Sequence, residues 1–219
     1  MKERGKRLMI LGCISISIFV LWTILIQTVD VQPIGVNGTT VGFAAFNTMF
    51  HKWTGVHMNI YYITDWLGLV PVFVCMVFGC VGFVQLVKRK SLRKVDRDII
   101  LLGIYYVLVI MGYLVFEMIP INYRPILIDG FMEASYPSST TLLILSVMPT
   151  LTFQSKRRIE NRYIQKSIEV FSNLFIVFMV GGRLISGVHW FTDIVGSVML
   201  SVGMFHVYKG LVVSKDKEI

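Results

Sequence analysis

Three ionisable residues, Arg183, His189 and Asp193, lie close together in the segment GGRLISGVHWFTD. His189 and Asp193 are four residues apart, so on one helix they would share a face and the carboxylate could orient the imidazole. An oriented imidazole can attack an electrophile, and an arginine can bind an anion. The same residues could instead form a structural His–Asp pair with an arginine at a membrane boundary. The segment alone leaves both interpretations open.

A second segment, EMIPINYRPILIDGFMEASYPSSTT, carries Arg124 and Glu133. Its hydroxyl-rich end follows Pro137 and opens a predicted helix. The free N–H groups of a helix N-terminus favour an anion, so this end could bind one. The alternative is that Ser138 or Ser139 is only an N-cap after a proline turn.

The elements that must hold these residues are apolar helices. Of the 219 residues, 55% are hydrophobic and only 16% are charged. Soluble domains usually have about a quarter of their residues charged, so the composition excludes an ordinary soluble domain, a disordered chain and a disulfide scaffold. We predict a single all-α domain over residues 1–219, a six-transmembrane-helix bundle with spans at roughly 8–29, 63–87, 99–116, 138–153, 168–184 and 191–213. The first span follows basic residues as a signal peptide would, but it is long enough to cross a membrane and is predicted to be retained.

Basic residues orient this bundle. Eighteen of the 21 Lys and Arg residues flank the spans on one side, and Lys52, Arg124 and Arg183 lie on the other. The positive-inside rule places the larger group, and with it both termini, in the cytoplasm. The net charge of +8 therefore reflects membrane orientation, and we predict no nucleic-acid partner. The segments that then face outward are 30–62, 117–139 and 181–190.

The remaining histidines and cysteines do not predict a second site. The first outward segment contains FAAFNTMFHKW, which is either a short interfacial helix or a plain connector. His51 and His57 in this segment have no partnered acid, and we expect them to be structural. Cys13, Cys75 and Cys80 lie within apolar runs, so they predict neither a disulfide nor a metal site.

Taken together, the segments resemble the type 2 phosphatidic acid phosphatase superfamily, the integral-membrane lipid phosphatases. The pattern of that family is K-x6-R-P, then P-S-G-H, then S-R-x5-H-x3-D, carried on six helices. The order of the motifs and their predicted side of the membrane agree with the family. The residues that match the pattern are Arg124-Pro125, Pro137-Ser138, Arg183, His189 and Asp193.

The resemblance implies a mechanism. In the family, the histidine of the third motif attacks phosphorus and forms a phosphohistidine that water hydrolyses, which gives this role to His189. Asp193 would fix the tautomer of His189. The resemblance implies catalysis without a metal or other cofactor, and it implies that the phosphate is bound by Arg124, Arg183, Ser138 and Ser139.

Two departures from the first and third motifs change charge or size. Glu117 stands where the family has lysine, and a carboxylate cannot bind phosphate directly; it could instead pair with Arg124 or Arg183. Gly182 stands where the family usually has serine.

A further departure removes the family's proton donor. Thr140 stands at the position of the histidine of P-S-G-H, and Ser139 at that of its glycine. A threonine hydroxyl is too weak an acid to replace an imidazolium, and general acid catalysis contributes about 10²–10⁴-fold in rate. Either the substrate has a good leaving group, as a diphosphate ester does, or another group supplies the proton. Glu133 is a candidate for that group if burial favours its protonated form.

The sequence therefore predicts a membrane phosphatase that hydrolyses a lipid phosphate or a polyprenyl diphosphate at the extracytoplasmic face of the plasma membrane. Its partners would be that substrate and the surrounding membrane lipids. One alternative is a degenerate relative that binds phospholipid headgroups without turnover. Another is a small transporter whose Arg and His residues line a solute path, although no inverted repeat supports it.

Overall fold

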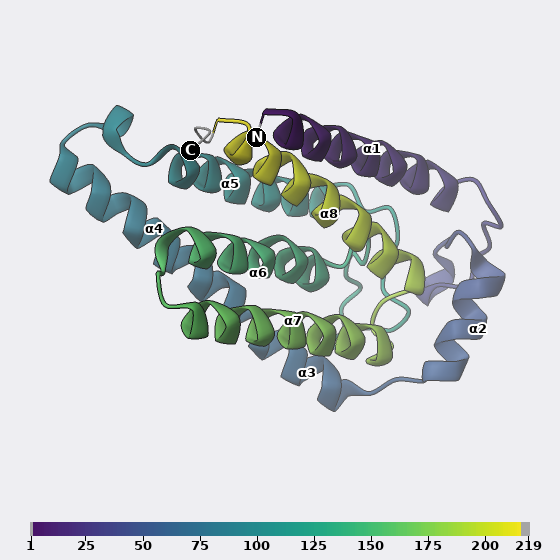
Figure 1. Ribbon diagram of the computed structural model, residues 1–219. Coiled ribbons are helices and arrows are strands. Elements are labelled where there is room, and N and C mark those ends of the chain that lie inside the picture. Colours follow the sequence, from purple (N-terminus) through teal and green to yellow (C-terminus); the bar gives the residue numbers. More distant parts are fainter. Residues whose placement is uncertain (1, 216–219) are drawn as a thin grey trace.

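The structure is a computed structural model that describes residues 2–215. These residues form a bundle of α-helices with two 3₁₀ turns, Val36–Gly38 and Leu92–Lys94, which confirms the predicted all-α class (Figure 1). The α-helices of the described chain are α1 Lys2–Ile26, α2 Ala44–Thr54, α3 Met58–Leu67, α4 Leu69–Arg89, α5 Arg97–Met118, α6 Ser139–Arg158, α7 Arg162–Ile185 and α8 Phe191–Val213.

Within residues 2–215, five helical segments are long and apolar enough to cross a membrane. Helices α3 and α4 form one of them, Met58–Arg89, so the predicted second span begins about one turn earlier than the sequence indicated. The other four segments are α1, α5, α7 and α8. The predicted fourth span corresponds to α6, which is not apolar enough to be among them, and the count of six spans stays a prediction.

The polar character of α6 follows from its central place in the bundle. It contacts α4, α5, α7 and α8, and Figure 1 shows it between neighbouring helices. Its side chains therefore meet protein instead of lipid, and a buried polar group is tolerated where it is hydrogen-bonded. The hydroxyl groups of Tyr106 and Thr150 are 2.7 Å apart, and Tyr105 donates to the carbonyl of Ser146. A central helix of this kind needs fewer apolar residues than a lipid-facing one.

Helices α1 and α8 pack closely in opposite directions. A Cβ atom added to Gly12 would lie 2.8 Å from the carbonyl oxygen of Gly203, and one added to Gly210 would lie 2.8 Å from that of Gly5. Small residues at such positions let two backbones approach within a membrane. The start of α1 and the end of α8 therefore lie at the same end of the bundle (Figure 1).

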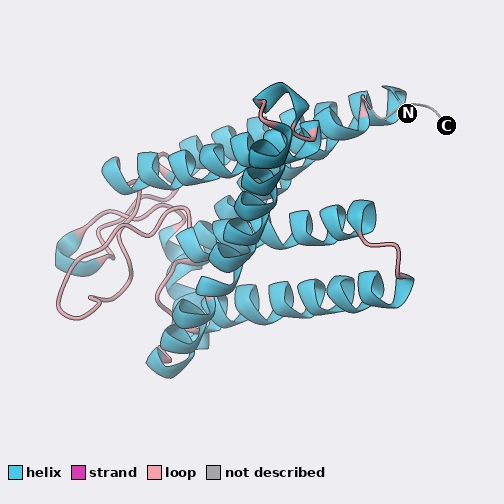
Figure 2. Cartoon of the chain, turned by 90° about the vertical axis from the view of Figure 1, so that its left-hand side faces the viewer, coloured by secondary structure: helices cyan, strands magenta, loops and turns pink. Residues whose placement is uncertain are grey.

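The opposite end of the bundle carries α2 and the longest loops (Figures 1 and 2). Helix α2 contains most of the segment FAAFNTMFHKW, so the helical alternative for that segment is confirmed. Its Trp53 is 80% exposed, while buried Asn47 donates to the hydroxyl of Thr192 and ties α2 to the start of α8. His51 contacts the carbonyl of Gly187 in the loop between α7 and α8, which fits the structural role expected for it.

The segment between α5 and α6 is an irregular β-hairpin. Residues 123 and 134 form an antiparallel bridge, and so do residues 128 and 131. The turn is Asp129-Gly130, where both residues have positive φ, 48° and 84°. This is the conformation that an Asp-Gly pair favours between two short strands. The hairpin folds Arg124 back over the end of the bundle.

Candidate active site

Four separate elements bring the predicted phosphate-binding and catalytic residues together. The hairpin supplies Arg124, the last turn of α7 supplies Arg183, the following loop supplies His189 and the first turn of α8 supplies Asp193. The loop can turn sharply because Gly187 has a φ of 71°, and a Cβ atom there would lie 2.0 Å from the carbonyl oxygen of Gly55. All four functional residues are buried.

The imidazole of His189 contacts Arg183. Its Nε2 atom lies 3.2 Å from the Nη2 atom of Arg183. Because a guanidinium can only donate, Nε2 is the acceptor in this contact. The neutral ring therefore carries its proton on Nδ1, and the lone pair of Nε2 points at the arginine. An unprotonated Nε2 atom has the lone pair that a nucleophilic histidine needs.

Asp193 lies beside His189, but not in the predicted way. His189 precedes α8 instead of sharing a helix with Asp193, and its Nδ1 atom is 3.9 Å from Oδ2 of Asp193. This distance is too long for a hydrogen bond. Oδ2 accepts from the backbone N–H of Trp190 at 2.9 Å, as in a capping box, and this bond draws the carboxylate toward the helix start. The expectation of a shared helical face is wrong.

Asn122 is a site residue that the sequence analysis did not predict. It is buried, and its amide donates to Oδ1 of Asp193 at 3.2 Å. The indole of Trp190 donates to the carbonyl of Tyr123 at 2.9 Å, which fastens the hairpin to the start of α8. The hairpin therefore has two roles. It carries Arg124, and it positions the carboxylate of Asp193, which faces His189.

The two arginines form a buried pair of cations. Arg183 is fully buried and Arg124 is 8% exposed. Both guanidinium groups lie over the ring of Tyr61, at 4.9 Å and 5.6 Å from its centre. Among the described residues, Nε and Nη1 of each arginine have no hydrogen-bond partner. Buried donors without acceptors are rare in folded proteins, and an anion between these arginines would accept from them.

Each arginine is paired with one carboxylate, and neither carboxylate is Glu117. Nη2 of Arg124 lies 3.0 Å from Oε2 of Glu133, and Nη1 of Arg183 lies 3.7 Å from Oδ1 of Asp65. Glu117 is exposed near the end of α5. Its expected pairing with an arginine is therefore wrong, because the hairpin and α3 bring other acids closer.

The hydroxyl residues at the start of α6 take different places. Ser138 is fully buried, and its side chain donates to the hydroxyl of Thr141 at 3.0 Å instead of capping the helix backbone. The interpretation of Ser138 as a side-chain N-cap is therefore wrong. Ser139 and Thr140 are partly buried and line a cavity.

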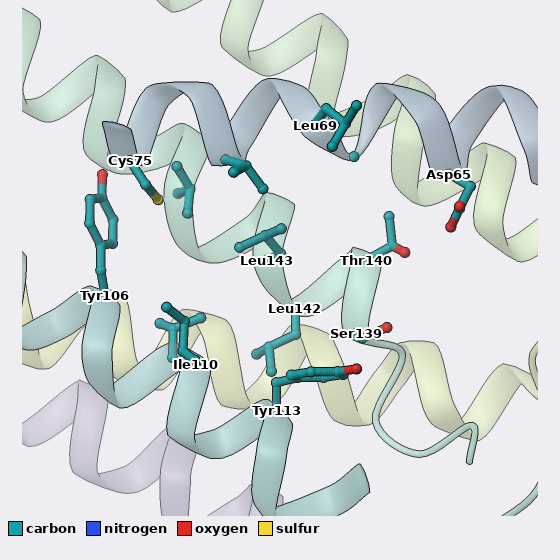
Figure 3. A pocket seen from close by; sticks show the side chains of 14 residues that line it. Asp65, Leu69, Cys75, Tyr106, Ile110, Tyr113, Ser139, Thr140, Leu142 and Leu143 are labelled. Carbon is teal, nitrogen blue, oxygen red and sulfur yellow. The ribbon is translucent and has the colours of Figure 1, made fainter. Parts of the chain in front are cut away.

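This cavity, of about 390 Å³, lies between α3, α4, α5 and α6 (Figure 3). One end is polar and holds Asp65, Ser139 and Thr140, together with the hydroxyl of Tyr113. The rest is mainly apolar, with a lining that includes Leu69, Val72, Ile110, Leu143 and Val147. Since Asp65 pairs with Arg183, the polar end of the cavity adjoins the arginines.

The charge state of His189 follows from its surroundings. Burial, followed by the positive charges of Arg124 and Arg183, lowers the pKa of this imidazole well below its ordinary value of 6.5. A lowered pKa means that the ring stays neutral as the pH falls through 6.5, so the neutral form predominates in the substrate-free protein at neutral pH.

We predict that the side chain of His189 is still neutral at pH 6.5, the ordinary pKa of an imidazole, in the substrate-free protein. The measurement is a pH titration by ¹⁵N NMR of histidine-labelled protein in detergent. The protein has four histidines, so a difference spectrum against His189→Asn isolates the signal of His189. A midpoint at or above 6.5 would contradict the electrostatic account of the site.

Nothing in residues 2–215 groups three or more His, Cys, Asp or Glu side chains in a way that could hold a metal ion. The three cysteines are free and lie in α1 and α4.

The fold and the site define a multi-pass helical membrane protein in which two buried arginines lie beside a neutral histidine. Residues 115–215 match the model of the PAP2 superfamily. This match confirms the resemblance found in the sequence. No curated protein matches the chain.

A solved structure has the same fold over nearly the whole chain. It is described as the crystal structure of the first transmembrane PAP2 type phosphatidylglycerolphosphate phosphatase from Bacillus subtilis. The TM-score is 0.65 at 17% sequence identity, and the likeness covers 94% of this chain and 98% of the other. The likeness therefore extends the shared fold beyond residues 115–215 to the first helices.

Proposed function

We propose that the protein is a membrane phosphatase that hydrolyses a lipid phosphate or a polyprenyl diphosphate through a phosphohistidine on His189. One observation carries this proposal. The Nε2 lone pair of His189 lies 3.2 Å from a buried arginine that, with Arg124, holds several N–H donors without acceptors. A phosphoryl group bound to those donors would stand beside the nucleophile.

Two displacements complete the proposed reaction. In the first, a bond forms between Nε2 of His189 and phosphorus while the bond from phosphorus to the leaving oxygen breaks. The imidazole becomes cationic, and the carboxylate of Asp193 stabilises the charge on the Nδ1 side. In the second, water attacks phosphorus, the P–N bond breaks and inorganic phosphate leaves. The arginines stabilise the equatorial oxygens in both steps.

The cavity supports a lipid as the substrate. An apolar chain could lie among the helices while its phosphate group reaches the arginines beyond the polar end. The phosphatase from Bacillus subtilis with the same fold supports a phospholipid phosphate, and the absence of the family's histidine at Thr140 supports a diphosphate. A second candidate is a protein that binds headgroups without turnover, since Glu117 and Thr140 replace two residues of the family pattern.

Phosphate release from detergent-purified protein tests the proposal. The panel consists of phosphatidic acid, phosphatidylglycerol phosphate and a polyprenyl diphosphate. We expect release from at least one of them that exceeds the rate of a matched His189→Ala preparation. Binding of these lipids without any release would support the non-catalytic alternative.

The proposal includes a topology of six spans, with α6 as the fourth, both termini in the cytoplasm and the site at the extracytoplasmic face of the plasma membrane. The distribution of basic residues supports it. The loop between α6 and α7 and the adjoining helix ends are basic, whereas the site end of the bundle carries Arg124, Arg183 and Lys52.

Cysteine labelling in intact cells is expected to show this orientation. In a background from which the native cysteines have been removed, Asp129→Cys should react with a membrane-impermeant maleimide and Arg157→Cys should react only after permeabilisation. Asp129 lies at the tip of the hairpin and Arg157 at the opposite end of α6. The reverse pattern would place the site at the cytoplasmic face.

A further inference from the structure

We infer that Asp65 of α3 donates the proton to the leaving oxygen and then accepts a proton from the attacking water. This role rests on the proposed phosphatase function and names the acid–base residue of the same site. No relation between Asp65 and the other site residues is visible in the sequence, where Asp65 lies 118 positions before Arg183.

The first observation is the position of Asp65 on the guanidinium group of Arg183. Nη2 of Arg183 contacts Nε2 of His189 at 3.2 Å, and Nη1 lies 3.7 Å from Oδ1 of Asp65. The nucleophile and the carboxylate therefore adjoin different nitrogens of one guanidinium. A phosphoryl group bound to that guanidinium would have both within reach. Phosphoryl transfer needs the attacking and leaving atoms roughly in line across phosphorus.

The second observation is that Asp65 lines the cavity assigned to the substrate chain. Figure 3 shows its carboxylate at the polar end, on the same side as Thr140 and Ser139. The leaving oxygen carries the lipid chain, so it must lie on the cavity side of phosphorus. Asp65 is the carboxylic acid among the described residues that line this cavity. Its side chain is 56% exposed, so the carboxylate is accessible.

The third observation is that small residues let α3 approach the site. A Cβ atom added to Gly182 would lie 2.7 Å from the side chain of Thr64, the neighbour of Asp65. A Cβ atom added to Gly68 would lie 3.6 Å from the methyl group of Thr140. Gly182 and Thr140 are positions at which the chain has smaller residues than the family pattern. The close approach of α3 therefore places the carboxylate of Asp65 and the side chain of Thr140 on the wall of the same cavity.

The other groups near the site fit the role less well. Glu133 is paired at 3.0 Å with Arg124, and it does not line the cavity. The hydroxyl groups of Ser139, Thr140 and Tyr113 line the cavity but are weaker acids than a carboxylic acid. Glu133 therefore remains a partner of the phosphate-binding arginine, and Asp65 takes the role of the acid.

The proposed proton transfers balance over one turnover. A phosphate bound at Arg183 displaces the carboxylate of Asp65 from the guanidinium, and in the proposed cycle Asp65 takes one proton from solvent at this step. It gives this proton to the leaving oxygen as the P–O bond breaks and the N–P bond forms. In the second displacement it accepts a proton from the attacking water. For a lipid monophosphate, the products are the lipid alcohol and inorganic phosphate. When the phosphate leaves Arg183, Asp65 returns its proton to solvent and pairs again with the guanidinium, so Asp65 and His189 return to their starting states.

The test compares Asp65→Asn with Glu133→Gln on two classes of substrate. One is an alkyl lipid monophosphate, whose alkoxide leaves only when protonated, and the other is 4-nitrophenyl phosphate, whose phenolate leaves unaided. Each rate is divided by that of the native protein. For Asp65→Asn we expect a loss of about 10²–10⁴-fold on the alkyl ester but less than about tenfold on the aryl ester. Glu133→Gln should affect both substrates alike.

Other outcomes would overturn the inference. Equal losses of Asp65→Asn on both substrates would mean that Asp65 only positions Arg183. If the variant is too unstable to purify, the rates of the native protein are measured instead on a series of aryl and alkyl phosphates with different leaving groups. A shallow dependence of the rate on the leaving group supports a proton donor, and a steep one contradicts it. If the native protein hydrolyses none of the esters, the phosphatase function itself is wrong. If it hydrolyses them and the Asp65→Asn variant does so equally well, only the role of Asp65 is wrong.

Discussion

Replacing His189 with alanine should reduce phosphate release by about 10³-fold or more, because the reaction would lose its nucleophile. The imidazole is 4% exposed and its Nε2 atom faces Arg183, so the alanine variant would lack the nitrogen nucleophile beside the arginine. The measurement is the initial rate of phosphate release from the best lipid substrate by purified protein.

His206→Ala is the matched control for this variant. His206 also belongs to the last part of the chain, but it lies well inside α8 and its ring contacts the carbonyl of Val202. We expect its activity to remain near the native rate. If His189→Ala also retained the native rate, the phosphohistidine mechanism would be wrong.

Replacing Arg183 with lysine should reduce kcat by about 10²–10³-fold, although the positive charge is kept. The guanidinium of Arg183 adjoins His189 through one nitrogen and Asp65 through another, and it stacks on the ring of Tyr61. A lysine ammonium is a single point charge that cannot make these contacts together. Rates for Arg183→Lys with a lipid phosphate, measured over a range of concentrations, separate kcat from KM.

Arg157→Lys is the conservative substitution to compare with it. Arg157 lies at the far end of α6, where it pairs with Asp98 on α5. We expect Arg157→Lys to keep nearly the native kcat. A similarly small effect of Arg183→Lys would show that the site needs a positive charge but not the planar fork of an arginine.

The sequence predicted the apolar parts of the helices more closely than their polar ends. Long apolar runs predicted both ends of α5 and α8 within two residues, but α1 and α7 begin six residues earlier than predicted, because their first turns are polar and charged. Helix α6 was predicted to end at residue 153 but continues to Arg158. Its buried Gln154 and Ser155 contact protein instead of lipid, and hydropathy does not register such positions.

Of the candidate site, motif spacing predicted the residues but not all of their contacts. It indicated Arg124, Arg183, His189 and Asp193, and the fold brings these four together. It placed His189 and Asp193 on one helix, which is wrong. The carboxylate of Asp193 accepts a hydrogen bond from the backbone N–H of Trp190, and α8 begins only after His189. A spacing of four residues does not by itself establish that both belong to a helix.

Asn122 and Asp65 were missed for different reasons. Asn122 reaches Asp193 only because the hairpin folds back, and the Asp129-Gly130 turn was the local signal that could have predicted that fold. Asp65 is the charged residue within the predicted span 63–87, and an ionisable residue inside a span is a candidate for function. Its partner Arg183 depends on the packing of α3 against α7, which sequence periodicity does not reveal.

The most direct test of the phosphohistidine mechanism is to identify the residue that carries phosphate during turnover. Native protein is mixed with a ³²P-labelled lipid phosphate, denatured in alkali after a short reaction and digested, and the labelled peptide is sequenced. We predict a label that is stable in base and labile in acid, that lies on His189 and that is absent from His189→Ala. A label on another residue, or one that persists in His189→Ala, would contradict the proposed mechanism.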